Sequence, residues 1–361
     1  MAWFTILILP YLIIVFKIYR KLLTLKPFTF TAKPVTKVSV VIACRNEEEN
    51  LPGILKTLSE QDYPDSLLEI VIVDDHSSDK TFETAYSFKS PFRKVVLQNE
   101  GIGKKQALRV GINASSGTLI ITTDADCTAG SNWISSISAF YHVSGADMII
   151  CPVAAAVQKG FPGWFRELEF LSLQGITAGT AAADLPVMCN GANLAFTREI
   201  YQKHSGNLHD EISSGDDIFL LQSIKKEPAA KVEWLESTDA LITASSPPSI
   251  GSFLNQRRRW FSKWTAYDDP FTLFLGIATF AAILIQIFYT ALTFYDIKFG
   301  IELVIVCLSK WLVDFLILYN TTVRYKKRTL MRWFIPSQII YPFYVAIIAL
   351  YSLKGYSRKL N

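Results

Sequence analysis

Short hydrophobic runs rich in Val and Ile alternate with amphipathic stretches along the first third of the chain. Runs of this length and composition are typical of strands buried on both faces, and the stretches between them have helical periodicity. The predicted strands are residues 37–43, 69–73, 94–97 and 118–123. The predicted helices are residues 46–58, 80–89 and 103–113. This β-α-β-α-β-α-β order predicts an α/β fold with a doubly wound, mostly parallel sheet and helices on both faces.

The first of these helices has a local start signal. Asn46 is followed three residues later by Glu49, which resembles a capping box with Asn as the capping residue. We therefore expect a helix that opens at Asn46 and continues through Leu58.

Polar clusters directly follow three of the predicted strands. They are Arg45-Asn46-Glu47, Asp74-Asp75 and Asp124-Ala125-Asp126. An Asp pair at a strand end is also common as a helix cap or Asx turn. However, ligands of doubly wound sheets bind beyond the carboxyl ends of the strands, so these clusters place five carboxylates at one edge. Such a set repels itself unless a cation joins it, and Mg²⁺ or Mn²⁺ carrying a diphosphate would supply that charge.

Gly101 and Gly103 invite comparison with a dinucleotide-binding loop. That fingerprint requires a third Gly at position 106, where this chain has Gln106, so the pattern is excluded. We expect the two glycines to form a turn, with Lys104 and Lys105 directed toward phosphates from the start of the next helix.

Half of the residues are hydrophobic, a high share for a soluble protein, and the excess lies near the two ends. Residues 3–16 are apolar and precede a basic stretch, which is the reverse of the order in a cleaved signal peptide. Further apolar segments are residues 271–295, 301–320 and 334–353. The predicted organisation is a membrane anchor (1–26), a catalytic domain (37–265) and a membrane region (271–353).

Basic residues are clustered beside the apolar segments. Residues 257–263 precede the first C-terminal segment, and residues 324–328 follow the second. Since Lys and Arg mark the cytoplasmic side of membrane proteins, we expect residues 37–265 to face the cytoplasm from the inner membrane. The formal net charge of +4 in this arrangement suits an anionic membrane surface better than nucleic acid.

Two segments each allow two interpretations. Lys310 and Asp314 share a helix face within 301–320, which makes this segment a candidate for an interfacial or re-entrant helix. The pair is either functional or a mutual salt bridge. The aromatic-rich stretch 161–176 is either a helix that packs in a core or one that lies at the membrane interface beside a lipid acceptor.

The five cysteines have no C-x-x-C spacing, and the four histidines have no metal-ligand spacing. We therefore expect reduced thiols, with neither a disulfide framework nor a zinc site.

Seven short motifs carry a resemblance to a known family. In chain order they are Ser39–Glu47, Val73–Ser77, Gly103–Leu108, Asp124–Asp126, Cys189–Phe196, Ser214–Asp217 and the Gln-x-x-Arg-Trp motif Gln256–Trp260. Together they resemble the family-2 inverting glycosyltransferases with a GT-A catalytic fold, over about residues 37–265. The flanking apolar segments resemble the membrane-bound branch, which includes polysaccharide synthases and ceramide glucosyltransferases.

The resemblance implies a donor site for a nucleotide-sugar, with a UDP-sugar as the expected donor. Its residues would be Glu47 and Asp75 at the uracil and ribose, Lys104 and Asp124 at the nucleotide, and Arg259 at the diphosphate. Asp124 and Asp126 would also hold the Mg²⁺ or Mn²⁺ bound to that diphosphate.

The resemblance also implies an acceptor side and a mechanism. Asp217 would be the general base, with Asp216 and Trp260 on the side of a lipid-linked or glycan acceptor. Asp216 stands where the family often has Glu, a change that keeps the charge. A single displacement would invert the anomeric centre as UDP leaves.

Three alternatives remain beside this hypothesis. A processive polysaccharide synthase shares the Gln-x-x-Arg-Trp motif. A membrane transporter is disfavoured because most of the chain reads as soluble. An inactive partner subunit would be expected to have lost Asp217 or the Asp124/Asp126 pair, and all three residues are present.

Overall fold

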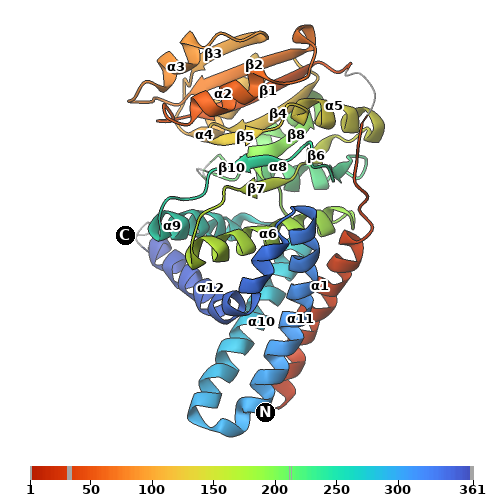
Figure 1. Ribbon diagram of the computed structural model, residues 1–361, viewed down its shortest axis with the longest axis vertical. Coiled ribbons are helices and arrows are strands. Elements are labelled where there is room, and N and C mark those ends of the chain that lie inside the picture. Colours follow the sequence, from red (N-terminus) through yellow and green to blue (C-terminus); the bar gives the residue numbers. More distant parts are fainter. Residues whose placement is uncertain (1, 31–34, 211, 213, 358–361) are drawn as a thin grey trace. The chain divides into compact units, whose positions relative to one another are not determined.

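A computed structural model of the chain describes residues 2–30, 35–210, 212 and 214–357. The chain divides into two compact units (Figure 1). The sheet unit comprises residues 25–156 and 188–245, and the helical unit comprises residues 1–24, 157–187 and 246–361. The segments 157–187 and 246–265 therefore pack with the terminal helices, although they fall inside the range 37–265 expected for the catalytic domain.

In the described part of the sheet unit, the main sheet has seven strands in the order β3-β2-β1-β4-β8-β6-β9. Their bounds are β1 Val38–Cys44, β2 Leu68–Asp74, β3 Arg93–Gln98, β4 Leu119–Asp124, β6 Met148–Ile150, β8 Leu194–Thr197 and β9 Val232–Trp234. Strands β1 to β4 pair in parallel, whereas β8 runs antiparallel to both β4 and β6. The predicted α/β fold with a mostly parallel sheet is confirmed. A smaller sheet joins β5 (Cys127–Ala129), β10 (Ile242–Ala244) and β7 (Val153–Ala155).

The parallel strands form where hydrophobic residues cover both faces. Every residue of β2 is buried, as is expected for a central strand between helices. Helix α4 (Lys104–Ala114) approaches these strands closely at Gly111. A Cβ atom there would lie 2.6 Å from Val41 Cγ1 and 2.9 Å from Val73 Cγ2, so a larger residue would push the helix off the sheet.

The remaining α-helices of the sheet unit are α2 Leu51–Ser59, α3 Thr81–Ser87, α5 Trp133–Ser144, α7 Arg198–His204 and α8 Asp216–Lys225. The capping box expected at Asn46 is wrong, because α2 begins at Leu51. Asn46 instead has a positive φ of 54°, and its Oδ1 accepts the backbone N–H of Ser78 at 2.8 Å. Its side chain thus joins the loops after β1 and β2.

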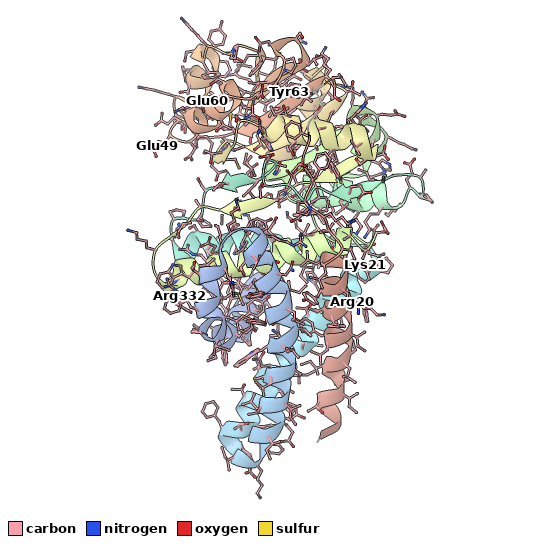
Figure 2. The ribbon with its side chains drawn as sticks, turned by 45° about the vertical axis from the view of Figure 1, so that its right-hand side comes forward. Arg20, Lys21, Glu49, Glu60, Tyr63 and Arg332 are labelled. Atoms are coloured by element: carbon pink, nitrogen blue, oxygen red, sulfur yellow. The ribbon has the colours of Figure 1, made fainter. Side chains whose placement is uncertain are left out.

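The helical unit is assembled from three separate parts of the chain. Its α-helices are α1 Leu9–Leu22, α6 Phe161–Ala181, α9 Ile250–Phe261, α10 Pro270–Tyr295, α11 Gly300–Arg324 and α12 Phe334–Ser357. Helices α10 and α11 lie side by side as a long hairpin, and α1 lies against α11 (Figures 1 and 2).

Two helical stretches among the described residues are long and apolar enough to cross a membrane, namely Pro270–Tyr295 and Arg328–Ser352. Helix α1 has 14 residues, which is short for a full span. Helix α11 has 25 residues but carries Glu302, Lys310 and Asp314.

Helix α6 crosses α1 and α11 at two glycines. A Cβ atom on Gly175 would lie 2.3 Å from Thr321 Oγ1, and one on Gly179 would lie 2.8 Å from the backbone oxygen of Ile18. Leu168 and Leu171 of the same helix are buried in a cluster with residues of α11 and α12. Helix α6 is thus a packed element of the helical unit.

The charged pair in α11 forms a buried ion pair. Lys310 Nζ lies 2.6 Å from Asp314 Oδ2, and the hydroxyl of Tyr11 donates to Asp314 Oδ1 at 2.5 Å. Lys310 Nζ also lies 3.5 Å from Gln338 Oε1 of α12. The mutual salt bridge is the arrangement found, and it connects α1, α11 and α12.

Basic residues mark one end of the helical unit. Arg20 and Lys21 end α1 at the level of α6, away from the turn between α10 and α11 (Figure 2). Arg332 lies at the same end, where its guanidinium is 5.4 Å from the ring centroid of Trp164. Trp164 stacks on Trp333 with 4.5 Å between the ring centroids. Paired indoles and basic residues beside apolar helices are typical of a membrane–water interface.

Candidate active site

Strand register brings the polar clusters of the sheet unit to one edge. Cys44 at the end of β1 pairs with Asp74 of β2, and Ala43 pairs with Asp124 of β4. Because the three strands are parallel, the residues that follow them emerge at the same carboxyl edge. The sequence-predicted residues Glu47, Asp75, Asp124 and Asp126 all belong to this edge.

Asp75 is held as a carboxylate. It is 4% exposed, and its Oδ1 accepts from Asn99 Nδ2 at 2.7 Å and from the backbone N–H of Gly103 at 3.0 Å. Burial favours the neutral form, but these hydrogen bonds outweigh it and hold the pKa of Asp75 below its ordinary value. Asn99 was missed in the sequence, although it follows the third strand just as the other polar clusters follow theirs.

Asp126 has the opposite environment. Burial, followed by the negative charges of Asp124 and Glu47, raises its pKa to about 6. Asp124 is paired with Lys104, which donates to Asp124 Oδ1. Partial burial would lower the pKa of Lys104, but the charges of Asp124, Asp216 and Asp217 raise it above its ordinary value. Negative charge at this edge therefore exceeds what Lys104 can neutralise.

Glu47 lies in the loop after β1. Its backbone N–H donates to Thr81 Oγ1 at 2.7 Å, which fixes the loop against the start of α3. Its Oε2 accepts from Asn50 Nδ2 at 2.7 Å.

Asp216 and Asp217 open helix α8, after Gly215 with a φ of 97°. Asp217 Oδ2 accepts the backbone N–H of Gly191 at 3.0 Å, and Oδ1 accepts the N–H of Ile218 at 2.8 Å. A helix N-terminus stabilises a carboxylate, and each oxygen retains a lone pair for a further donor. The charges of Asp216 and Asp217 both raise the pKa of Lys104. The start of α8 therefore lies near the carboxyl edge of the sheet.

Lys105 does not point toward this edge, contrary to expectation. It is buried, and its Nζ donates to the backbone oxygens of Leu208, His209 and Ile212 at 2.7–2.8 Å. Successive residues of a helix point about 100° apart, so Lys104 and Lys105 cannot both face the carboxylates. Lys105 therefore anchors the loop that leads into Asp216.

The donor chemistry at Asp124 and Asp126 fits a hard divalent cation. Both offer only oxygen ligands. Burial, followed by the negative charges of Asp124 and Glu47, raises the pKa of Asp126, so a bound cation would stabilise its ionised form. The described residues contain no group of three or more His, Cys, Asp or Glu side chains arranged to hold a metal. Two carboxylates fit the usual Mg²⁺ arrangement, in which phosphate and water oxygens complete the shell.

Arg259 and Trp260 belong to the helical unit, on α9. Arg259 is exposed, and Trp260 is half-buried with its ring centroid 4.1 Å from the guanidinium of Arg257.

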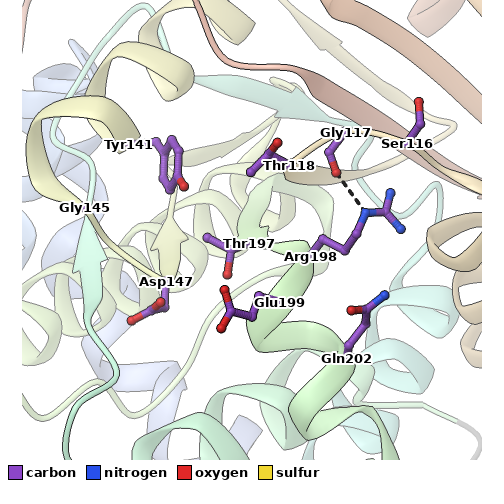
Figure 3. Close-up of a pocket in the computed structure, with 10 residues that line it drawn as sticks. All are labelled: Ser116, Gly117, Thr118, Tyr141, Gly145, Asp147, Thr197, Arg198, Glu199 and Gln202. Atoms are coloured by element: carbon purple, nitrogen blue, oxygen red, sulfur yellow. Dashed lines mark hydrogen bonds between the residues drawn. The ribbon is translucent and has the colours of Figure 1, made fainter.

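A cavity of about 400 Å³ lies at the opposite edge of the sheet (Figure 3). Gly117 and Thr118 precede β4 there, and Thr197 ends the antiparallel β8. Arg198 is engaged in this wall, since its Nε donates to the oxygen of Gly117 at 3.0 Å. None of the sequence-predicted site residues lines this cavity.

Comparisons with known proteins agree with the fold and the motifs. Residues 39–205 match the family model described as glycosyl transferase family 2. Glycosyltransferase AglE of Haloferax volcanii is 32% identical over 139 residues, which is 38% of this chain and 46% of that protein. An undecaprenyl-phosphate 4-deoxy-4-formamido-L-arabinose transferase of Proteus mirabilis is 37% identical over 100 residues, or 27% of this chain and 31% of that protein. These matches span less than half the length of each curated relative.

A solved structure with the same fold supports this comparison. It is the mannosyltransferase PcManGT of Pyrobaculum calidifontis in complex with GDP-Man and Mn²⁺, with a TM-score of 0.57. The match covers 90% of this chain and 98% of that chain at 16% identity, so it is evidence of fold.

We predict that Lys105→Met lowers the free energy of unfolding by roughly 1–3 kcal/mol, because three backbone oxygens lose a charged donor. Lys104→Met is the matched control. It removes the neighbouring lysine, whose side chain is 44% exposed, and a pair of this kind contributes about 0–1 kcal/mol. Thermal unfolding of the two purified variants measures the difference. Equal melting temperatures for both would contradict the anchoring role.

Proposed function

We propose that this chain transfers a sugar from a nucleotide-sugar to a lipid-linked acceptor, because residues 39–205 match the family model described as glycosyl transferase family 2. The observation that carries the proposal is the grouping of Lys104, Asp124, Asp126 and Asp217 at the carboxyl edge of a mostly parallel sheet. Together these groups could bind a diphosphate and a cation and supply a general base.

The donor half of the site would bind the nucleotide. Asp75 stays ionised, and it and Glu47 would accept hydrogen bonds from the base and ribose of a UDP-sugar. Lys104 would move part of its interaction from Asp124 to the phosphates. Asp124 and Asp126 would hold Mg²⁺ or Mn²⁺, which when bound offsets the negative charge of the diphosphate.

The reaction would need one proton acceptor on the side of the attacking hydroxyl. Asp217 would take that proton as the oxygen attacks the anomeric carbon opposite the departing UDP. The new glycosidic bond forms as the sugar–phosphate bond breaks, which inverts the anomeric centre. Lys104 and Arg259 would neutralise charge that grows on the leaving diphosphate, with Asp216 and Trp260 on the acceptor side. The roles of Arg259 and Trp260 rest on the Gln-x-x-Arg-Trp motif.

A lipid-linked acceptor is supported by the helical unit. Two of its helical stretches could cross a membrane, and its paired indoles suit the membrane–water interface. A relative carries the name of a transferase that acts on undecaprenyl phosphate. The basic residues Arg20 and Lys21 at the end of α1 favour a cytoplasmic location for that end of the helical unit. We propose on this ground that the catalytic domain faces the cytoplasm from the inner membrane.

Vesicles of known orientation test donor, acceptor and sidedness together. Inverted membrane vesicles containing the chain receive radiolabelled nucleotide-sugars one at a time, and lipid-extractable label is counted. Transfer of one label in inverted vesicles, and little in right-side-out vesicles, is expected because nucleotide-sugars do not cross the bilayer. Label in a high-molecular-weight, lipid-free fraction would instead indicate a polysaccharide synthase.

We predict that Asp217→Asn lowers kcat by roughly 10²–10⁴-fold, because an amide cannot take the acceptor proton. Donor binding should be nearly unchanged. Asp210→Asn, which alters a carboxylate paired with Arg109, is the control and should keep its activity. Near wild-type turnover in Asp217→Asn would rule out this residue as the base.

We also predict that transfer requires Mg²⁺ or Mn²⁺ and that Asp126→Ala loses the metal-dependent part of UDP binding. Calorimetric titration with UDP, with and without the metal, separates the two contributions. Full activity in excess EDTA, or metal-dependent UDP binding that survives the substitution, would contradict the assignment.

A further inference from the structure

Helix α9 carries the Gln-x-x-Arg-Trp motif and is fixed to α6 by a buried ion pair. Arg257 Nε lies 2.9 Å from Glu169 Oε1, and its NH2 nitrogen lies 2.5 Å from Glu169 Oε2. Both side chains are 7% exposed. The guanidinium and the carboxylate form a bidentate contact, which restricts their relative orientation as well as their distance.

Arg257 also touches two residues of the motif. Its NH1 nitrogen donates to Gln256 Oε1 at 2.8 Å. Its guanidinium lies 4.1 Å from the ring centroid of Trp260 and 4.7 Å from that of Phe253. Every nitrogen of the guanidinium is thus engaged, and the two rings contact the same group.

The pair also reaches a third helix. The hydroxyl of Tyr344, on α12, donates to Glu169 Oε1 at 3.3 Å. The ring of Tyr344 stacks on that of Phe253, with 5.6 Å between the ring centroids. Glu169 thus joins the helix that carries the motif to α6 and α12. A shift of α6 or α12 would move Glu169 and therefore Arg257, which contacts Gln256 and Trp260.

We propose that Glu169 and Arg257 are positioning residues that hold Gln256 and Trp260 in their working orientation. The inference rests on the proposed function, because it assigns these residues to sugar transfer. It goes beyond the motif, since Glu169 lies outside it and Arg257 occupies one of its two variable positions. Neither residue is required to touch donor or acceptor.

A double variant provides the test. Glu169→Gln by itself would leave a buried cation without a partner, which is strongly destabilising. Glu169→Gln/Arg257→Met removes both charges, and such replacements are often tolerated by the fold. The matched control is Glu167→Gln/Lys327→Met. It removes another ion pair of α6, between the buried Glu167 and the partly buried Lys327, in which neither partner belongs to the motif.

Two measurements on the full chain in lipid nanodiscs separate positioning from general support. With 5-fluorotryptophan in the chain, the ¹⁹F resonance of Trp260, assigned with Trp260→Phe, should shift in the test variant and stay in place in the control. In the transfer assay, kcat should fall about 10- to 100-fold and the acceptor KM should rise in the test variant, with donor affinity retained. The control should keep its wild-type kcat.

The outcomes are distinct. An unshifted Trp260 resonance, a wild-type kcat in the test variant, or equal losses in both double variants would overturn the positioning role. If the wild-type chain transfers no sugar, the proposed function fails, and the ¹⁹F shift still decides whether the ion pair orients Trp260.

Discussion

Uncompensated negative charge at the carboxyl edge of the sheet is the constraint on which the site depends. Parallel pairing leaves Asp75 and Asp124 at the carboxyl ends of the strands that flank β1, and the start of α8 brings Asp216 and Asp217 near Lys104. The protein treats these acids differently. Asp75 is stabilised as an anion by Asn99 and Gly103, whereas the pKa of Asp126 is raised to about 6. Hydrogen bonds stabilise the ionised form of Asp75, whereas the ionised form of Asp126 would be stabilised by a positive partner such as the proposed cation.

The sequence was most informative where one physical requirement determined the local structure. The run predicted at 37–43 forms β1 at Val38–Cys44, because a strand buried on both faces needs an unbroken hydrophobic run. The acidic residues at the strand ends could also be predicted, because the carboxyl ends of parallel strands lie at the same edge of the sheet. The four-residue strand β8 was not predicted, because Leu194–Thr197 is too short to have a period.

The errors come from side chains whose partners are distant in sequence. Asn46 was expected to cap a helix locally, yet it binds Ser78, 32 residues away. Lys105 was expected beside Lys104 at the phosphates, yet its partners begin at Leu208. Helix geometry alone predicts that Lys105 points away from Lys104. The partner of Asn46, in contrast, can be identified only from the folded structure. The ion pair between Glu169 and Arg257, 88 residues apart, was equally invisible.

The bond between Tyr11 and Asp314 joins residues that are 303 positions apart. During synthesis the ribosome makes α1 long before α11, whose Asp314 accepts the hydrogen bond from Tyr11. The sheet unit ends at Ser245, so all its strands exist before α10 is made. The bond between Tyr11 and Asp314 therefore cannot form until α11 has been made. Assembly of the helical unit is in this sense a late event, and truncation of the C-terminus would remove the partner of the first helix.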